Sequence, residues 1–262
     1  EHKNDNTMSL LILEILTYSK LDLTELYISR EIGTNFQEQQ FDISPKDFLR
    51  FAKEDLKENN DRGYINSLTN SKRAIDCQID ETFEILVNSS DNFNPIVKKF
   101  LNYFDFEADI PIKLQIINAL NLAPSLIISK IRTLRNKLEH FYQKPSIAEV
   151  KEALDVADLF IRSVLGKFNS VWYEFKITDG KDKFEINFEF DPIERNFKIK
   201  LLKGEEIVKE FYLDVNQVEF WILLRLMLSI DDEIEIQETF KILLKQIGHP
   251  IPSDKINIWL YD

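Results

Sequence analysis

From Ser170 onward, apolar and polar residues alternate along the chain, which is the pattern of strands with one buried face. Four blocks follow this pattern: VWYEFKIT, KFEINFEF, NFKIKLLK and EIVKEFYL. The linkers between them, DGKD, DPIER and KGEE, are rich in turn-forming residues, so a four-stranded antiparallel meander is predicted over 171–213. Two helices, at about 215–229 and 233–248, and a strand within 256–261 are predicted after it.

Before Ser170, apolar residues recur at three- and four-residue steps, which predicts helices. Ser44-Pro45, with Asp47 in the first turn, is a typical helix start, and this helix is expected to end near Glu58. Further helices are predicted at about 62–87, 95–106, 111–122, 124–142 and 147–168. Residues 8–30 also have helix-compatible spacing, but their β-branched and aromatic residues leave a strand open.

The two patterns together predict an α+β fold, in which an all-α helical bundle is followed by a smaller antiparallel β-meander with two helices. The expected divisions of the chain are an N-terminal extension over 1–44, a helical domain over 45–170 and a C-terminal α+β domain over 171–262.

The distribution of charge sets the middle of the chain apart. The whole sequence has a net charge of −12, which argues against a protein that coats nucleic acid through a wide basic face. Residues 1–44 and 171–262 are acidic, whereas 45–170 is neutral. Within the neutral part, the span from Pro111 to Leu138 contains no acid, although it does contain several cations. These are Lys113, Lys130, Arg132, Arg135 and Lys137.

Other features of the composition exclude several classes of protein. The single cysteine, Cys77, rules out an internal disulfide and a cysteine-rich zinc site, and no acidic metal motif is visible. No apolar run is long enough to span a bilayer, and the apolar stretch 9–16 is short and lacks the flanks of a signal peptide. We therefore expect a cytoplasmic protein that needs no metal or cofactor and has no membrane partner.

The helix expected over 124–142 carries the most informative chemistry in the chain. In a helix, Arg132, Asn136 and His140 follow one another at four-residue steps and share a face, whereas Arg135 is offset. Such a face offers a proton carrier, a guanidinium that binds anions and an amide that orients the histidine. These groups suit cleavage of a phosphodiester. The alternative is structural: His140 caps the helix end and Arg135 pairs with Glu139.

At these residues the chain resembles the HEPN superfamily, whose mark is R-x4–6-H, often with a polar residue after the arginine. Here the motif is RNKLEH, from Arg135 to His140, and the resemblance extends to the order of helices over 45–170. It implies a metal-independent endoribonuclease that acts as a homodimer, with two motifs facing each other across a cleft. Typical members are toxins and effectors of antiviral defence.

The resemblance also implies roles for individual residues. His140 would be the acid–base group, Arg135 would bind or polarise the phosphate, and Asn136 would orient the pair. Cations that the motif does not require are expected to contact RNA; these are Lys130, Arg132 and Lys137.

The motif continues to Tyr142, which is similar to minimal HEPN toxins that a nucleotidyltransferase antitoxin silences by adenylylating the tyrosine. Tyr142 is thus a possible modification site, and a packed aromatic residue is the alternative. This chain departs from those toxins in its N-terminal extension and in residues 171–262. That difference favours an effector joined to a sensing or docking module.

Two other interpretations stay open at the level of sequence. One is a non-catalytic HEPN module that binds RNA, a nucleotide or a partner protein, which the acidic balance of the chain favours. The other is a helical scaffold in which the short motif occurs by coincidence.

Overall fold

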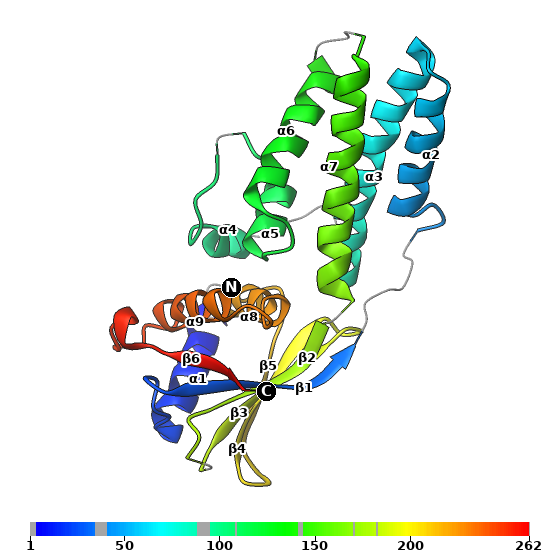
Figure 1. Ribbon diagram of the computed structural model, residues 1–262. Coiled ribbons are helices and arrows are strands. Elements are labelled where there is room, and N and C mark those ends of the chain that lie inside the picture. The colour runs from blue at the N-terminus through cyan, green and yellow to red at the C-terminus, as the bar shows by residue number, and fades with distance from the viewer. Residues whose placement is uncertain are drawn as a thin grey trace. The chain divides into compact units, whose positions relative to one another are not determined.

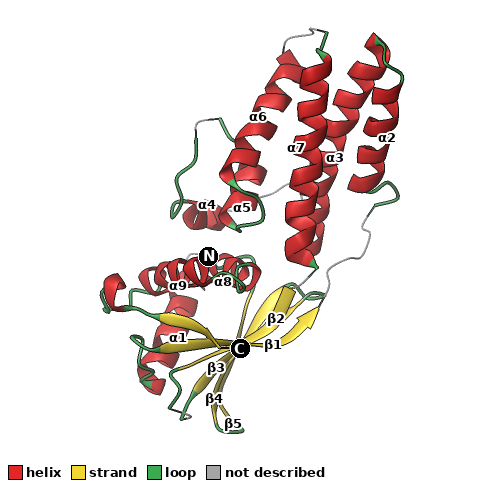
Figure 2. Ribbon diagram, in the orientation of Figure 1, coloured by secondary structure: helices red, strands yellow, loops and turns green. Residues whose placement is uncertain are grey.

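A computed structural model describes residues 4–34, 41–87, 95–107, 109–140, 144–169, 171–181 and 183–261. The chain divides into two compact units. The sheet unit combines 1–35, 91–104 and 170–262, and the helical unit combines 36–90 and 105–169. Figure 1 follows the elements along the chain, and Figure 2 shows that the strands all belong to the sheet unit in the part of the chain that is described.

The sheet unit is built on a six-stranded mixed sheet with the order β5-β4-β3-β2-β1-β6. The strands are β1 (Leu26–Thr34), β2 (Val171–Thr178), β3 (Glu185–Asp191), β4 (Asn196–Lys203), β5 (Glu206–Leu213) and β6 (Ile258–Tyr261). Neighbouring strands from β5 to β1 are antiparallel, whereas β1 and β6 are parallel. The hairpin turns use backbone conformations with positive φ at Gly180 (69°), Arg195 (51°) and Gly204 (60°).

The alternation read from the sequence separates the two faces of this sheet. One face is apolar and is covered by α1 (Asn4–Ser19), α8 (Val218–Leu228) and α9 (Glu233–Gln246). Phe220 of α8 packs there against Phe190 and Phe197. The opposite face carries cross-strand ion pairs, such as Lys200 Nζ to Glu189 Oε2 at 2.9 Å. A sheet with one covered and one polar face is common when its strands are antiparallel.

The expected fold class is wrong, because the β-structure is a six-stranded mixed sheet and not a small antiparallel meander. The four predicted strands of 171–213 are confirmed as β2 to β5. The remaining two strands come from opposite ends of the sequence: β1 lies between β2 and β6. The predicted extension 1–44 therefore supplies both α1 and an interior strand of the sheet. Hydrophobic pattern shows that a segment is suited to a strand, but not which distant strand it pairs with.

The helical unit contains α2 (Pro45–Lys57), α3 (Asp61–Val87), α5 (Ile112–Ala119), α6 (Ser125–His140) and α7 (Ile147–Phe168). Capping residues determine where two of these helices start. Ser44 and Asp47 form a reciprocal capping box at α2, and Ser146 and Glu149 form one at α7. Both α3 and α6 pack against α7, and α2 packs against α3 and α7. The predicted helix bounds of 147–168 agree with α7.

The chain passes between the units more than once. The helical unit is inserted between β1 and β2, and within that insertion the segment 91–104 returns to the sheet unit. There α4 (Pro95–Leu101) buries Phe100 completely against Trp221 of α8, with ring centroids 6.3 Å apart. Tyr103 donates a hydrogen bond of 2.8 Å to Oε1 of Gln246 in α9. Residues from the middle of the sequence thus help to form the core of the sheet unit.

Candidate active site

The proposed motif lies on α6, which is one uninterrupted helix from Ser125 to His140. Pro124 precedes the helix and its carbonyl oxygen accepts from the amides of Ile127 and Ile128, which starts the first turn. The predicted helix over 124–142 is confirmed up to His140. Because the backbone is helical throughout, Asn136 and His140 are one turn apart and Arg135 is on the same turn as Asn136.

The first half of α6 is fixed by packing within the helical unit. Ile128 and Ile131 are buried, at 1% and 0% exposure, whereas Leu126 on the opposite side is 72% exposed. Ser129 donates to Oε2 of Glu107 at 3.3 Å. An amphipathic stripe therefore orients the helix before the motif begins.

Lys130 has an acidic partner on the neighbouring helix. Its Nζ lies 2.5 Å from Oε1 of Glu152 in α7, and both side chains are about half exposed, at 50% and 55%. An exposed ion pair of this kind contributes little to stability and exchanges readily with solvent. The predicted contact of Lys130 with RNA would have to compete with this pair.

The structure gives the backbone of the motif but not its side-chain geometry. The side chains of Arg132, Arg135, Asn136, Lys137 and His140 lie outside the described part of the structure, and Tyr142 lies outside it altogether. Their predicted roles stay predictions.

The motif lies near the starts of two other helices of the helical unit. Lys144, four residues beyond the end of α6, forms an ion pair with Asp61, the first residue of α3. The start of α7 at Ile147 follows three residues later. The motif thus lies at the end of the helical unit where α3 and α7 begin.

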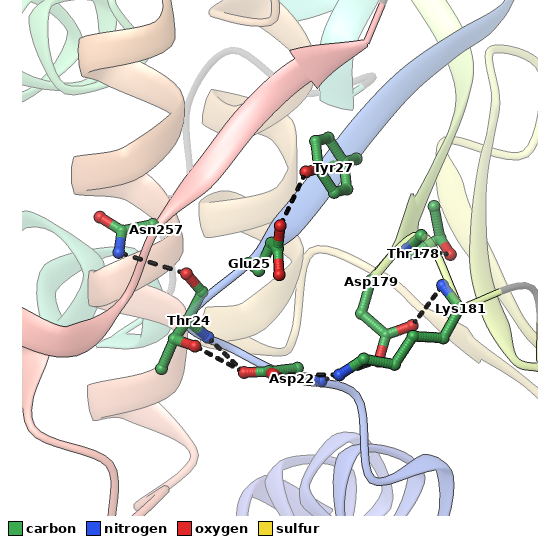
Figure 3. Close-up of polar contacts among 9 residues, drawn as sticks. Asp22, Thr24, Glu25, Tyr27, Thr178, Asp179, Lys181 and Asn257 are labelled. Carbon is green, nitrogen blue, oxygen red and sulfur yellow. Dashed lines mark hydrogen bonds and ion pairs between the residues drawn. The ribbon is translucent and has the colours of Figure 1, made fainter.

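A second polar cluster, in the sheet unit, has a structural explanation (Figure 3). The carboxylate of Asp22 accepts hydrogen bonds from the Thr24 hydroxyl at 2.6 Å and from Lys181 Nζ at 3.0 Å. Asp179 accepts from the amides of Asp22 and Lys181, both at 3.1 Å. The Thr24 bond, followed by the Lys181 bond, lowers the pKa of Asp22 to about 2. These bonds join the loop before β1 to the β2–β3 hairpin.

The sequence prediction missed two buried charges in α8. Glu219, 1% exposed, accepts from Ser9 of α1 and from Nε2 of Gln246. Arg225, 7% exposed, binds Thr239 and Glu235 of α9 and lies 4.8 Å from the ring of Phe104. A charge inside the apolar run VEFWILLRLML is the signal that a partner exists, because an unpaired buried charge is costly. These contacts connect α8 to the elements around it.

Two further observations concern metal binding and membrane-spanning helices. Where side chains are described, no group of three or more His, Cys, Asp or Glu residues is arranged to hold a metal ion. Nor does any helix in the described ranges combine the length and apolar character needed to cross a bilayer.

Comparison of the chain with protein-family models, curated proteins and solved structures gives no match.

Proposed function

We propose that the helical unit is a metal-independent endoribonuclease of the HEPN type that acts as a homodimer. The observation that carries this proposal is the placement of Arg135, Asn136 and His140 on one uninterrupted helix, at the end of the unit where two other helices begin. The spacing agrees with the R-x4–6-H motif, and the acid-free span 111–138 reduces repulsion of RNA.

The proposed reaction is an attack of the RNA 2′-oxygen on the adjacent phosphorus. The imidazole of His140 takes the proton of the 2′-hydroxyl, and the guanidinium of Arg135 stabilises the charge that grows on the phosphate oxygens. The bond from phosphorus to the 5′-oxygen breaks, and the second motif of the dimer supplies a proton to this leaving oxygen. The products are a 2′,3′-cyclic phosphate and a 5′-hydroxyl.

A comparison of histidine variants tests this proposal. Purified wild-type protein is expected to fragment total cellular RNA, while His140→Ala and Arg135→Ala leave it intact and unfold at the same temperature as wild type. His249→Ala is the matched control, because His249 lies in the sheet unit, where burial lowers its pKa. Cleavage by His140→Ala at the wild-type rate would remove the proposed acid–base group from the mechanism.

Chelation gives a second, independent test of the same proposal. Because the reaction uses only protein side chains, EDTA is expected to leave the cleavage rate unchanged. Strong inhibition by EDTA, reversed by a divalent ion, would point to metal-assisted hydrolysis instead.

The biological role that we propose is a cytoplasmic toxin or antiviral-defence effector, in which the sheet unit senses a signal or binds a regulatory partner. A nucleotidyltransferase antitoxin that adenylylates Tyr142 is the partner that the resemblance implies. Incubation with such an enzyme and ATP is expected to add one AMP to wild type and none to Tyr142→Phe, as measured by mass spectrometry.

The second candidate function is a non-catalytic module that binds RNA, a nucleotide or a partner protein. The net charge of −12 favours it, because an acidic protein has little long-range attraction for a polyanion. Measurable binding together with RNA that stays intact after prolonged incubation would decide for this module.

A further inference from the structure

A basic groove lies between α2 and α7, within the helical unit and apart from the motif residues. Its volume is about 510 Å³. The residues that line it are Lys46, Leu49, Arg50 and Lys53 of α2, and Asp158, Ile161, Arg162 and Leu165 of α7. On each helix these residues recur at three- and four-residue steps, so each helix contributes one continuous stripe.

The floor and the rim of this groove differ in chemistry. Leu49 and Ile161 form a buried apolar floor, at 6% and 2% exposure. The rim is cationic: the side chains of Arg50, Lys53 and Arg162 are 61%, 49% and 74% exposed. The lining contains four cations and one carboxylate, that of Asp158, and a second carboxylate, that of Asp47, pairs with Arg50. The groove is therefore positive although the chain as a whole has a net charge of −12.

Asp158 pairs with one cation of each helix, with Arg162 of its own helix α7 and with Lys53 across the groove on α2. Its Oδ2 lies 2.7 Å from Nε of Arg162, and its Oδ1 lies 3.7 Å from Nζ of Lys53. Both cations stay exposed enough to bind a further anion. Arg50 is held in a similar way by Asp47, with Nη2 2.9 Å from Oδ1. These pairs are exposed, like that of Lys130, so a bound phosphate would have to compete with the two carboxylates for the cations.

The chemistry of the groove suits a phosphate backbone. Arginine and lysine bind phosphate oxygens without reading the base, and the lining contains no aromatic side chain on which a base would stack. Lys46, Arg50 and Lys53 span about 10 Å along α2, so they can contact several successive groups of an extended polyanion. A ligand with a repeating charge fits this spacing better than a single small anion.

The position of the groove relative to α6 favours RNA over an acidic protein. Helix α7 packs against α2 and also against α6, and Glu152 of α7 pairs with Lys130 of α6. The motif ends beside the start of α7, and Ile147 and Arg162 are about 22 Å apart along that helix. An extended strand of RNA several nucleotides long is therefore needed to contact both the groove and the motif on α6.

We propose that the groove between α2 and α7 binds the sugar–phosphate backbone of single-stranded RNA and thereby positions the strand for cleavage at α6. The cleavage part of this statement rests on the proposed function; the binding part does not. The groove contributes affinity that is independent of base sequence and sensitive to salt.

The test uses the full chain with His140→Ala, so that RNA is bound but not cut. The probe is a fluorescently labelled single-stranded oligouridylate, and its anisotropy is measured over a range of KCl concentrations. The groove variant combines Lys46→Gln, Arg50→Gln and Arg162→Gln. The matched control combines Lys20→Gln, Lys203→Gln and Lys255→Gln, which makes the same change in net charge at exposed positions of the sheet unit.

The groove variant is expected to bind about tenfold more weakly, and the slope of log affinity against log salt is expected to decrease by about 2, because three phosphate contacts are lost. The control is expected to bind within about twofold of the parent. Equal weakening in both variants, or no weakening in either, would overturn the proposal. The proposal would also be overturned if polyglutamate bound to the parent protein but not to the groove variant while both bound RNA equally. That result would assign the groove to an acidic protein.

The two proposals fail in different ways. If the protein cleaves RNA in no assay but binds RNA through the groove cations, the proposal for the groove holds and the proposed nuclease activity is wrong. If the groove substitutions, made in a chain that retains His140, leave both cleavage and RNA binding normal, the proposed nuclease activity holds and the proposal for the groove is wrong.

Discussion

Replacing Ile28 with alanine tests whether β1, from the N-terminal part of the chain, is an interior strand of the sheet. Ile28 is fully buried, and it pairs with Ile177 of β2 on one side and Leu260 of β6 on the other. Truncating a fully buried isoleucine removes its transfer free energy and leaves a cavity, which costs about 2–5 kcal/mol.

A matched control is available on the same strand. Ile32 of β1 is 46% exposed, so Ile32→Ala loses only part of the transfer free energy and leaves no closed cavity. Its expected cost is about 1 kcal/mol or less. The difference between the two variants isolates the burial of Ile28 from any effect of alanine on strand formation.

Tryptophan fluorescence follows the sheet unit selectively. All three tryptophans of the chain, Trp172, Trp221 and Trp259, belong to this unit. With a urea dependence of about 2 kcal/mol per molar, a loss of 2–5 kcal/mol lowers the urea midpoint by about 1–2.5 M. If Ile28→Ala shifted the midpoint no further than Ile32→Ala, β1 would not be buried in the sheet and the fold described above would be wrong.

Three other predictions concern single positions. A Cβ at Gly63 would lie 2.5 Å from the carbonyl oxygen of Asp55, so Gly63→Ala is expected to destabilise the helical unit by about 1–3 kcal/mol in circular-dichroism melts. A Cβ at Gly166 would have nothing within 4 Å, so Gly166→Ala is the control and is expected to be neutral or stabilising. The pKa of Asp22 is lowered to about 2, so the ionised carboxylate stabilises the fold fully above pH 3.8 and loses this effect as pH falls toward 2. Asp22→Asn is expected to flatten the dependence of the free energy of unfolding on pH in this window. An unchanged pH dependence would contradict the bonds to Thr24 and Lys181. Burial raises the pKa of the Cys77 thiol from 9.0 to about 11, so alkylation of the native protein at mildly alkaline pH should be about 100-fold slower than in urea, and equal rates would show that the thiol is not shielded.

Local features of the sequence predicted most elements but not the sheet they form. Capping residues such as Ser146 and Glu149 determine a helix start through contacts three residues apart, so α7 was predictable from a short window. The strands of 171–213 were predictable for the same reason, because each is joined to the next by a short turn. The position of β1 depends on β2 and β6, which are far away in the sequence, and no local pattern encodes that pairing.

The candidate sites divide in a similar way. The helix that carries the motif was predictable, because its pattern is local, whereas the roles of the motif residues stay predictions. Half of the basic groove was also readable, since Lys46, Arg50 and Lys53 recur on one helix. The contribution of Arg162 was not, because it depends on how α2 packs against α7. The partners of Glu219 and Arg225 were hidden for the same reason: they lie on other elements.

The chemistry of the cut ends tests the central claim most directly. A defined RNA is incubated with wild-type protein in the presence of EDTA, and the ends of the fragments are identified by mass spectrometry. Attack by the 2′-oxygen, with His140 as the acid–base group, predicts a 2′,3′-cyclic phosphate on one fragment and a 5′-hydroxyl on the other, and no fragments with His140→Ala. Fragments that end in a 3′-hydroxyl and a 5′-phosphate, or RNA left intact by wild-type protein, would contradict the account.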